Sequence, residues 1–276
     1  ICRAAACYAE NPVFGRIQGI HLEGPFLNPE GAGAQNPDHL LLPDSEAVEE
    51  WNRIFPVKKV SFSPELPGGI AFTRRMTELG IMPSGAHSTA DYGCFQEARC
   101  AGMKHLTHFC NMMTPLHHLR PGMVGGGLLA DDVFVELIAD GIHLSDEMLR
   151  IIFRMKGADR IMLITDAMRA SGMPDGNYTL GGLEVIVRNG KAALPSGRIA
   201  GSLLGFSEGL KHLRALHLLP DSELIRCTGY NQARSLGIPE IGELKTGAFA
   251  DFVIAEDDWT PRAVWCDGKL QYEKTL

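Results

Sequence analysis

The sequence contains no C-x-x-C pair, although it has seven cysteines. An odd and scattered set of this kind argues against a disulfide framework and against a zinc site built from thiolates, so we expect reduced cysteines. The sequence also lacks an apolar run near the roughly 20 residues that span a bilayer, and it does not open on a basic segment followed by an apolar core. We therefore expect a soluble, cytoplasmic protein without a membrane partner.

Dense basic segments are missing as well. The chain carries 26 basic and 33 acidic residues, which gives a formal net charge of −7. A nucleic-acid-binding protein usually presents a basic patch to the phosphate backbone, so we expect no nucleic-acid partner. The 276 residues are 45% hydrophobic, which is enough for a sizeable core.

Short apolar runs alternate with helical patterns along the chain. The expected strands span residues 15–23, 57–65, 81–88, 104–111, 133–143 and 160–167. Helical patterns occupy 43–55, 68–80, 90–102 and 145–157, with Asp44 or Ser45 and Ser145 as N-caps and a glycine closing the last three. Because such alternation returns successive strands to the same sheet in the same direction, it predicts an α/β protein with a parallel sheet. Six such strand–helix units, with several strands that end on a His, Asp or Glu, favour a (β/α)8 TIM-like barrel over an open doubly wound sheet.

Changes in composition and residue pattern divide the chain into four parts. Residues 1–176 are expected to form the partial barrel, and residues 177–202 a β-rich segment of a satellite sandwich or a barrel insertion. Residues 203–248 should hold C-terminal barrel helices, two of them within 203–237, and residues 249–276 should supply β-sandwich strands. Because the chain lacks an initial methionine and opens on what looks like the end of a helix, we expect a fragment without about its first two barrel strands.

Polar side chains stand at or just past the ends of five expected strands: Glu23, His87, His108, His143 and Asp166. A closed barrel would bring all five to one mouth, where such enzymes place their catalytic groups. A carboxylate with two neutral imidazoles suits a divalent metal such as Zn2+ and leaves a coordination position for water. The pattern therefore favours a hydrolytic metal centre.

Each residue also has an ordinary structural interpretation. A single glutamate at a strand end is more often a solvated cap, a single histidine more often has a hydrogen-bonding role, and Asp166 has the alternative of capping a helix. His21 fits either a core histidine or a partner that supports Glu23. The five polar residues occupy equivalent positions in successive strand–helix units, and this favours a shared functional role over separate structural roles. The glycine-rich segment 125–129 lacks the order of a phosphate-binding loop, so we expect a tight turn or close packing there.

Six segments in register carry a resemblance to a known family. In chain order they are HLEGPFLNPEGAGAQNP, GAHSTADY, HLTHFCNMMTPLHH, ADGIHL, LITDAM and IAGS. They resemble the N-acetylglucosamine-6-phosphate deacetylases of the amidohydrolase superfamily, from about residue 15 to the C-terminus. The resemblance implies an amidohydrolase barrel with a small C-terminal β-sandwich portion.

The resemblance further implies the chemistry of the site. Glu23, His87 and His108 would bind one divalent metal, Zn2+ with Fe2+, Mn2+ and Co2+ as alternatives. Asp166 would be the catalytic acid/base, taking a proton from the attacking water and delivering it to the leaving amine. The reaction would convert N-acetylglucosamine 6-phosphate to glucosamine 6-phosphate and acetate, in amino-sugar catabolism.

By the same resemblance a sugar-phosphate pocket is lined by Ala34, Gln35, Asn111, Met112, His143, Ile199, Ala200 and Gly201. Gln35 would lie near the substrate carbonyl oxygen. In HHLRPG the arginine stands one place later than in the H-H-R pattern of the family, and Arg120 is the candidate for the phosphate because a guanidinium pairs bidentately with it. In some relatives a neighbouring subunit supplies this contact, so a homodimer stays an alternative for this chain.

Two other functions remain alternatives. One is another amidohydrolase, acting on N-acetylgalactosamine 6-phosphate or a cyclic amide, which would share the metal ligands. The other is an inactive truncated protein that only binds a metal or a sugar phosphate.

Overall fold

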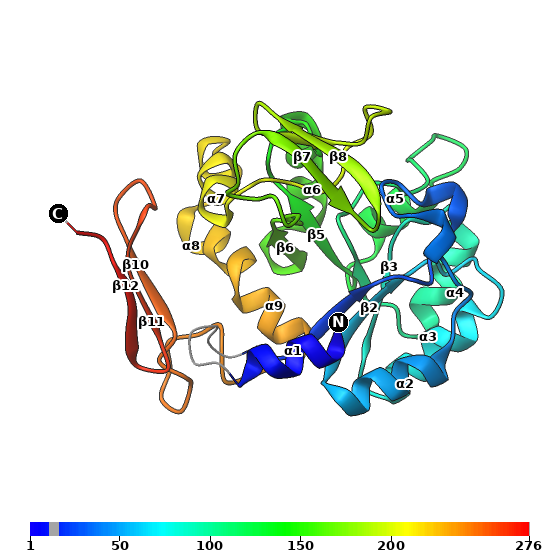
Figure 1. Ribbon diagram of the computed structural model, residues 1–276, viewed down its shortest axis with the longest axis horizontal. Coiled ribbons are helices and arrows are strands. Elements are labelled where there is room, and N and C mark those ends of the chain that lie inside the picture. The colour runs from blue at the N-terminus through cyan, green and yellow to red at the C-terminus, as the bar shows by residue number, and fades with distance from the viewer. Residues whose placement is uncertain (11–16, 276) are drawn as a thin grey trace.

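A curled sheet of six parallel strands forms the centre of the molecule, in the order β1 to β6 (Figure 1). The structure is a computed structural model and describes residues 1–10 and 17–275. The strands are β1 (Ile20–Glu23), β2 (Val57–Phe62), β3 (Met82–Gly85), β4 (His105–Leu106), β5 (Phe134–Ile138) and β6 (Ile161–Ile164). Their order and parallel direction confirm the prediction, and each strand is shorter than predicted. Residues 15 and 16 of the first predicted strand lie outside the described residues.

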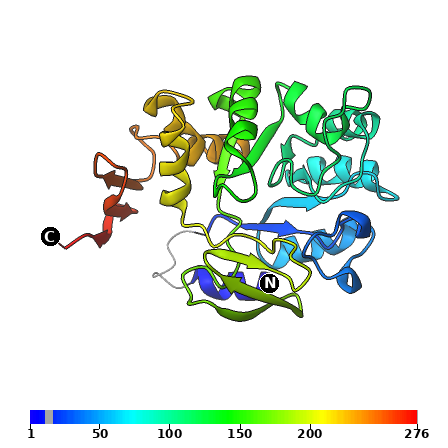
Figure 2. The ribbon, with the colours of Figure 1, turned by 90° about the horizontal axis from the view of Figure 1, so that it is seen from above.

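Helices cover the outside of this sheet (Figures 1 and 2). They are α1 (Cys2–Ala9), α2 (Ser45–Ile54), α3 (Gly69–Glu78), α4 (Tyr92–Ala101), α5 (Gly122–Leu129) and α6 (Asp146–Lys156), and each contacts the next along the chain. Asp44 caps α2 by accepting from the backbone N–H of Ala47, and Ser145 caps α6 in the same way. The expected helix ends at Gly80, Gly102 and Gly157 also hold within one or two residues.

Helix α5 was not predicted, because glycine disfavours a helix and three glycines stand side by side in it. The structure gives them a packing role. A Cβ placed on Gly127 would lie 2.5 Å from side-chain atoms of both Leu106 and Phe109. The absence of side chains therefore lets α5 approach the sheet at β4, which agrees with the close packing expected for residues 125–129.

Replacing Gly127 by Ala is expected to destabilise the fold by about 1–3 kcal/mol, because the added methyl overpacks a fully buried site. Gly93 is a matched control, since it also lies in a helix but is exposed on α4. Gly93→Ala should change the free energy of unfolding by less than about 1 kcal/mol. Urea unfolding of both variants measures the difference. Equal stability of the two variants would contradict this packing role.

An antiparallel sheet of three strands follows β6 and precedes the last helices. Its strands are β7 (Gly176–Leu180), β8 (Leu183–Arg188) and β9 (Lys191–Ala193). It packs around a small hydrophobic cluster of its own that includes Met168, Val185 and Ala200. Asn36, in the segment after β1, donates to the carbonyl oxygen of Gly181 and so joins this sheet to the carboxyl side of the barrel strands.

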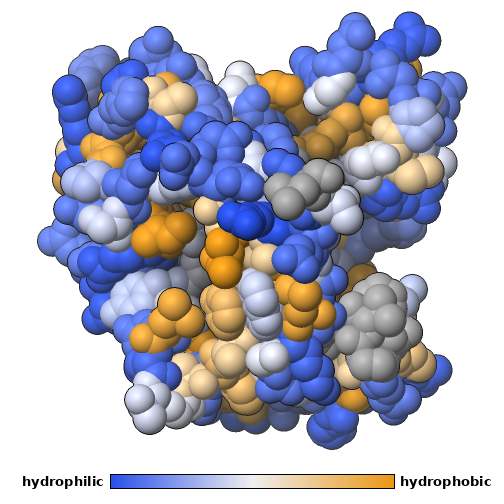
Figure 3. Space-filling view, turned by 90° about the vertical axis from the view of Figure 1, so that its left-hand side faces the viewer, coloured by the Kyte–Doolittle hydropathy of each residue, from blue (hydrophilic) through white to orange (hydrophobic). Residues whose placement is uncertain are grey.

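Residues 203–237 contain more helix than the two predicted: α7 (Phe206–Ala215), α8 (Asp221–Leu224) and α9 (Tyr230–Ser235), with a 3-10 turn between the last two. The C-terminal β portion is a sheet of β10 (Phe252–Ala255), β11 (Pro261–Cys266) and β12 (Lys269–Glu273). Figure 3 views the molecule from the side of this sheet and shows apolar side chains scattered among polar ones. Across the described ranges, no helix has the length and apolar character needed to cross a membrane.

Candidate metal centre

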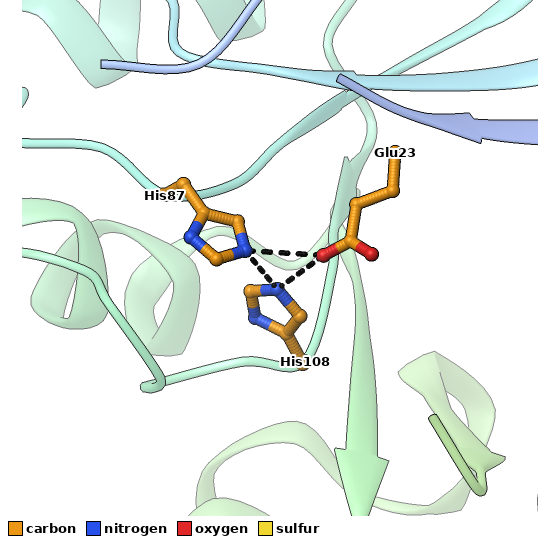
Figure 4. Close-up of side chains that lie close together, drawn as sticks. All are labelled: Glu23, His87 and His108. Carbon is orange, nitrogen blue, oxygen red and sulfur yellow. Dashed lines mark hydrogen bonds and ion pairs between the residues drawn. The ribbon is translucent and has the colours of Figure 1, made fainter. Parts of the chain in front are cut away.

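Three side chains from separate strand ends meet at one point. Glu23 is the last residue of β1, and His87 and His108 follow β3 and β4 by two residues. Glu23 Oε1 lies 3.0 Å from His87 Nε2 and 3.1 Å from His108 Nε2, and the two Nε2 atoms are 3.0 Å apart (Figure 4). The sheet thus brings together the three residues that the sequence analysis assigned to a metal.

The donor set fits a divalent metal. Ligand atoms about 2.0 Å from a tetrahedral zinc ion lie about 3.3 Å from one another, close to the separations seen here. His87 Nδ1 lies 2.8 Å from the carbonyl oxygen of Gly31, which can only accept, so Nδ1 carries the proton and Nε2 offers a lone pair to the centre. A triangle of one carboxylate oxygen and two imidazole nitrogens is therefore a candidate metal site, with open positions for other ligands.

The backbone at this mouth adopts an uncommon conformation. His87, His108 and Asp166 have φ angles of 46°, 34° and 50°, in the left-handed region that non-glycine residues rarely occupy. Such residues persist only where surrounding contacts hold them, and they cluster at functional sites. Gly31 is one of those contacts, because a Cβ there would lie 2.5 Å from the carbonyl oxygen of His87.

Hydroxyl side chains support the strands below the triad. Ser61 Oγ lies 2.6 Å from Thr107 Oγ1, which lies 2.7 Å from Ser84 Oγ. His21 Nε2 lies 2.6 Å from the same Ser61 Oγ, so His21 joins this network. Of its two predicted roles, the structure favours a supporting partner, because this network connects His21 through Ser61 to Thr107, directly before His108.

Two carboxyl groups at the mouth have pKa values that are shifted in opposite directions. Burial opposes ionisation of Glu23, but hydrogen bonds with His108 and His87 hold its pKa well below the ordinary value. Burial, and after it the nearby charge of Glu23, raises the pKa of Asp166 to about 6. Two carboxyl groups with separated pKa values are typical of sites where one binds and the other moves a proton.

His143 is held by a neighbour on its own loop. Its Nδ1 lies 2.7 Å from Asp140 Oδ2, and Asp140 Oδ1 accepts from the backbone N–H of Ile142 and of His143 at 2.9 Å. Burial opposes ionisation of Asp140, but these donors lower its pKa below the ordinary value. Asp140 therefore fixes the proton on Nδ1 and leaves Nε2 of His143 for other partners.

A cavity of about 350 Å3 opens over the triad. Its lining includes Glu23, His87, His108, His143 and Asp166. It also includes six further predicted site residues, namely Ala34, Gln35, Asn111, Met112, Ile199 and Gly201. Ala200 lies elsewhere, fully buried in the small cluster under the β7 to β9 sheet. Arg120 is exposed and lines a separate cavity with His117 and Leu119.

Some residues of the cavity wall were not predicted from the sequence: Gly33, Ala167, Met168, Leu180 and Arg198. Ala167 and Met168 directly follow Asp166, so their place could have been found from the strand end. Leu180 ends β7 and Arg198 follows β9. No local sequence pattern indicates that these two residues lie at the cavity. Asp140 was also missed, although its three-residue spacing from His143 was a usable signal.

Comparisons with known proteins agree with this geometry. A profile of the amidohydrolase family matches residues 17–271. The N-acetylglucosamine-6-phosphate deacetylase of Lysinibacillus sphaericus is 40% identical over 243 residues, which cover 87% of this chain and 63% of that protein. The chain thus spans less than two thirds of that relative's length.

Solved structures share the fold over nearly the whole chain. An N-acetylglucosamine-6-phosphate deacetylase from Thermotoga maritima superposes with a TM-score of 0.94 at 36% identity, covering 99% of this chain and 74% of that one. A variant of the Mycobacterium smegmatis N-acetyl-D-glucosamine-6-phosphate deacetylase, in complex with N-acetyl-D-glucosamine-6-phosphate, gives 0.92 at 32% identity, covering 98% and 72%.

Proposed function

The chain belongs to the amidohydrolase family, and on that premise we propose that it hydrolyses the acetamide of N-acetylglucosamine 6-phosphate. The products are glucosamine 6-phosphate and acetate. The observation that carries this proposal is the meeting of Glu23, His87 and His108 on one cavity wall with Asp166. Relatives and solved structures that bear this activity in their names support the choice of substrate.

Glu23, His87 and His108 would hold one divalent metal ion, which we propose to be Zn2+, with Fe2+, Mn2+ and Co2+ as alternatives. When bound, such an ion polarises a carbonyl group and acidifies water. Glu23 is suited to hold it because its low pKa keeps the carboxylate ionised. The proton on His87 Nδ1, fixed by Gly31, keeps the Nε2 lone pair directed at the same point.

Asp166 would move the proton. As a carboxylate it accepts a proton from the attacking water, and as a carboxylic acid it donates that proton to the nitrogen of the leaving amine. A pKa raised to about 6 by burial and by Glu23 lies close enough to neutrality for both steps. The amide C–N bond breaks as the nitrogen takes the proton, and the hydroxyl of the water stays on the acetyl carbon.

The rest of the cavity would orient the sugar. We propose that Gln35 donates to the acetamide oxygen, and that His143 contacts a sugar hydroxyl through Nε2. Asn111, Met112, Ile199 and Gly201 form the surrounding wall, and Ala200 supports it from beneath. The homodimer and the cytoplasmic location stay predictions from the sequence.

A substrate panel tests the proposed function. Acetate release is measured for N-acetylglucosamine 6-phosphate, N-acetylgalactosamine 6-phosphate and unphosphorylated N-acetylglucosamine, with Zn2+ present. The proposal expects the highest kcat/KM for the first of these. A higher kcat/KM for the galactosamine substrate would favour the alternative amidohydrolase, and bound metal without any acetate release would favour the inactive metal-binding protein.

Asp140 gives a prediction about positioning. Asp140→Asn should lower kcat/KM about tenfold, because the neutral amide accepts a weaker hydrogen bond and no longer selects one protonated form of His143. The metal content should not change, since Asp140 touches none of the triad. His143→Gln serves as the reference: the double variant should be no worse than His143→Gln alone. Additive losses in the double variant would show that Asp140 acts independently of His143.

A further inference from the structure

Arg198 is a cation on the cavity wall that the metal chemistry does not use. It lies in the turn after β9 and lines the same cavity as the triad and Asp166. Among the described residues it is the one lysine or arginine in that lining. The carboxylates of that lining are Glu23, one of the triad, and Asp166, to which the proposed proton transfer is assigned.

One hydrogen bond holds Arg198 in place. Its Nη1 donates to the carbonyl oxygen of Gly33 at 2.9 Å. Gly33 in turn packs against a metal ligand, because a Cβ there would lie 3.1 Å from the His87 ring. The guanidinium is therefore fixed to the segment that leads from the metal ligands to the cavity wall.

The remaining donors of Arg198 are free for a ligand. Within the part of the chain that the structure describes, neither Nε nor Nη2 has a hydrogen-bond partner and no carboxylate pairs with the guanidinium. A guanidinium offers parallel N–H groups that match two oxygens of a phosphate, and it stays charged at any pH at which the protein folds.

The chemistry of the substrate calls for such a group. In an N-acetylamino-sugar 6-phosphate the acetamide and the phosphate stand on different sides of the ring. A substrate whose acetamide faces the triad therefore presents its phosphate away from the triad. Glu23 and Asp166 repel a phosphate dianion, so a cation elsewhere in the cavity wall is needed to hold it.

We infer that Arg198 binds the phosphate group of the substrate and sets the preference for phosphorylated sugars. This inference rests on the proposed function and deepens it. It assigns to the β7 to β9 segment the part that the sequence analysis gave to Arg120. Arg120 lines a different cavity of the same chain.

Paired kinetics test the assignment. The purified protein and the variants Arg198→Ala, Arg198→Lys and Arg120→Ala are assayed with N-acetylglucosamine 6-phosphate and with N-acetylglucosamine. Arg198→Ala should raise KM about 10- to 100-fold for the phosphorylated sugar and leave kcat/KM for the plain sugar unchanged. Arg198→Lys should recover part of the loss, and Arg120→Ala should behave as the unmodified protein.

Binding of glucosamine 6-phosphate and of glucosamine, measured by calorimetry, gives a readout independent of turnover. Arg198→Ala should weaken only the phosphorylated ligand. Equal losses for both ligands would mean that Arg198 merely braces the Gly33 segment and would overturn the inference. A loss confined to Arg120→Ala would overturn it in favour of a contact between copies. If the unmodified protein neither binds nor hydrolyses the phosphorylated sugar, the proposed function fails together with the inference about Arg198.

Discussion

Replacing Asp166 by Asn is expected to lower the rate of acetate release by about 10²- to 10⁴-fold while the bound metal remains. Asparagine keeps the size of the side chain but neither accepts nor returns a proton. The carboxylate is not one of the three atoms that converge on the metal site, so its loss should leave binding there intact. The measurement combines steady-state acetate release with metal content per chain.

Asp257→Asn is the control for this variant, because Asp257 is exposed beside the C-terminal sheet. In the unmodified protein the rate should fall at low pH as Asp166 takes up its proton. Its pKa of about 6 is raised by burial and by Glu23, and a bound cation favours the carboxylate, so this fall should occur at or below about pH 6. A near-normal rate for Asp166→Asn would show that another group transfers the proton.

Removing any one triad ligand is expected to lower the affinity for the metal by more than about 100-fold. Loss of a partner that only orients a ligand already costs about 10- to 100-fold, and loss of the ligand itself costs more. The variants are Glu23→Ala, His87→Ala and His108→Ala, and the measurement is metal content after dialysis against a buffered Zn2+ concentration.

His118→Ala is the matched control for the triad variants, because His118 is an exposed histidine outside the cavity. It should keep its metal and its activity. The side chains of His87 and His108 are buried, so their removal can affect folding. Circular dichroism and thermal unfolding test whether these two variants fold. A triad variant that folds and binds metal with unchanged affinity would contradict this assignment of the site.

The meeting of the triad could be predicted because parallel strands end at one edge of a sheet. Glu23, His87 and His108 stand at equivalent positions of their units, so a correct reading of strand order was enough to bring them together. Their exact orientation could not be predicted, because it depends on left-handed backbone at His87 and His108 and on the approach of Gly31. These are tertiary contacts with no local sequence pattern.

The parts that the sequence did not reveal share one cause, which is contact between segments far apart in the chain. Helix α5 forms despite the poor helix propensity of glycine, and its glycines allow close packing, with Gly127 against Leu106 of β4 and Gly126 against Phe95 of α4. Arg198 reaches the cavity because its segment lies against Gly33, 165 positions earlier in the chain. Composition and periodicity report on neighbours in sequence, so they carry no information about such contacts.

We propose that one metal held by Glu23, His87 and His108 enables this chain to deacetylate an amino-sugar phosphate. The most direct measurement is the release of acetate from N-acetylglucosamine 6-phosphate by metal-free protein as Zn2+ is added. We expect no acetate without the metal and a rate that rises in proportion to bound metal up to one equivalent per chain. Undiminished acetate release without metal, or one bound equivalent with no acetate, would contradict it.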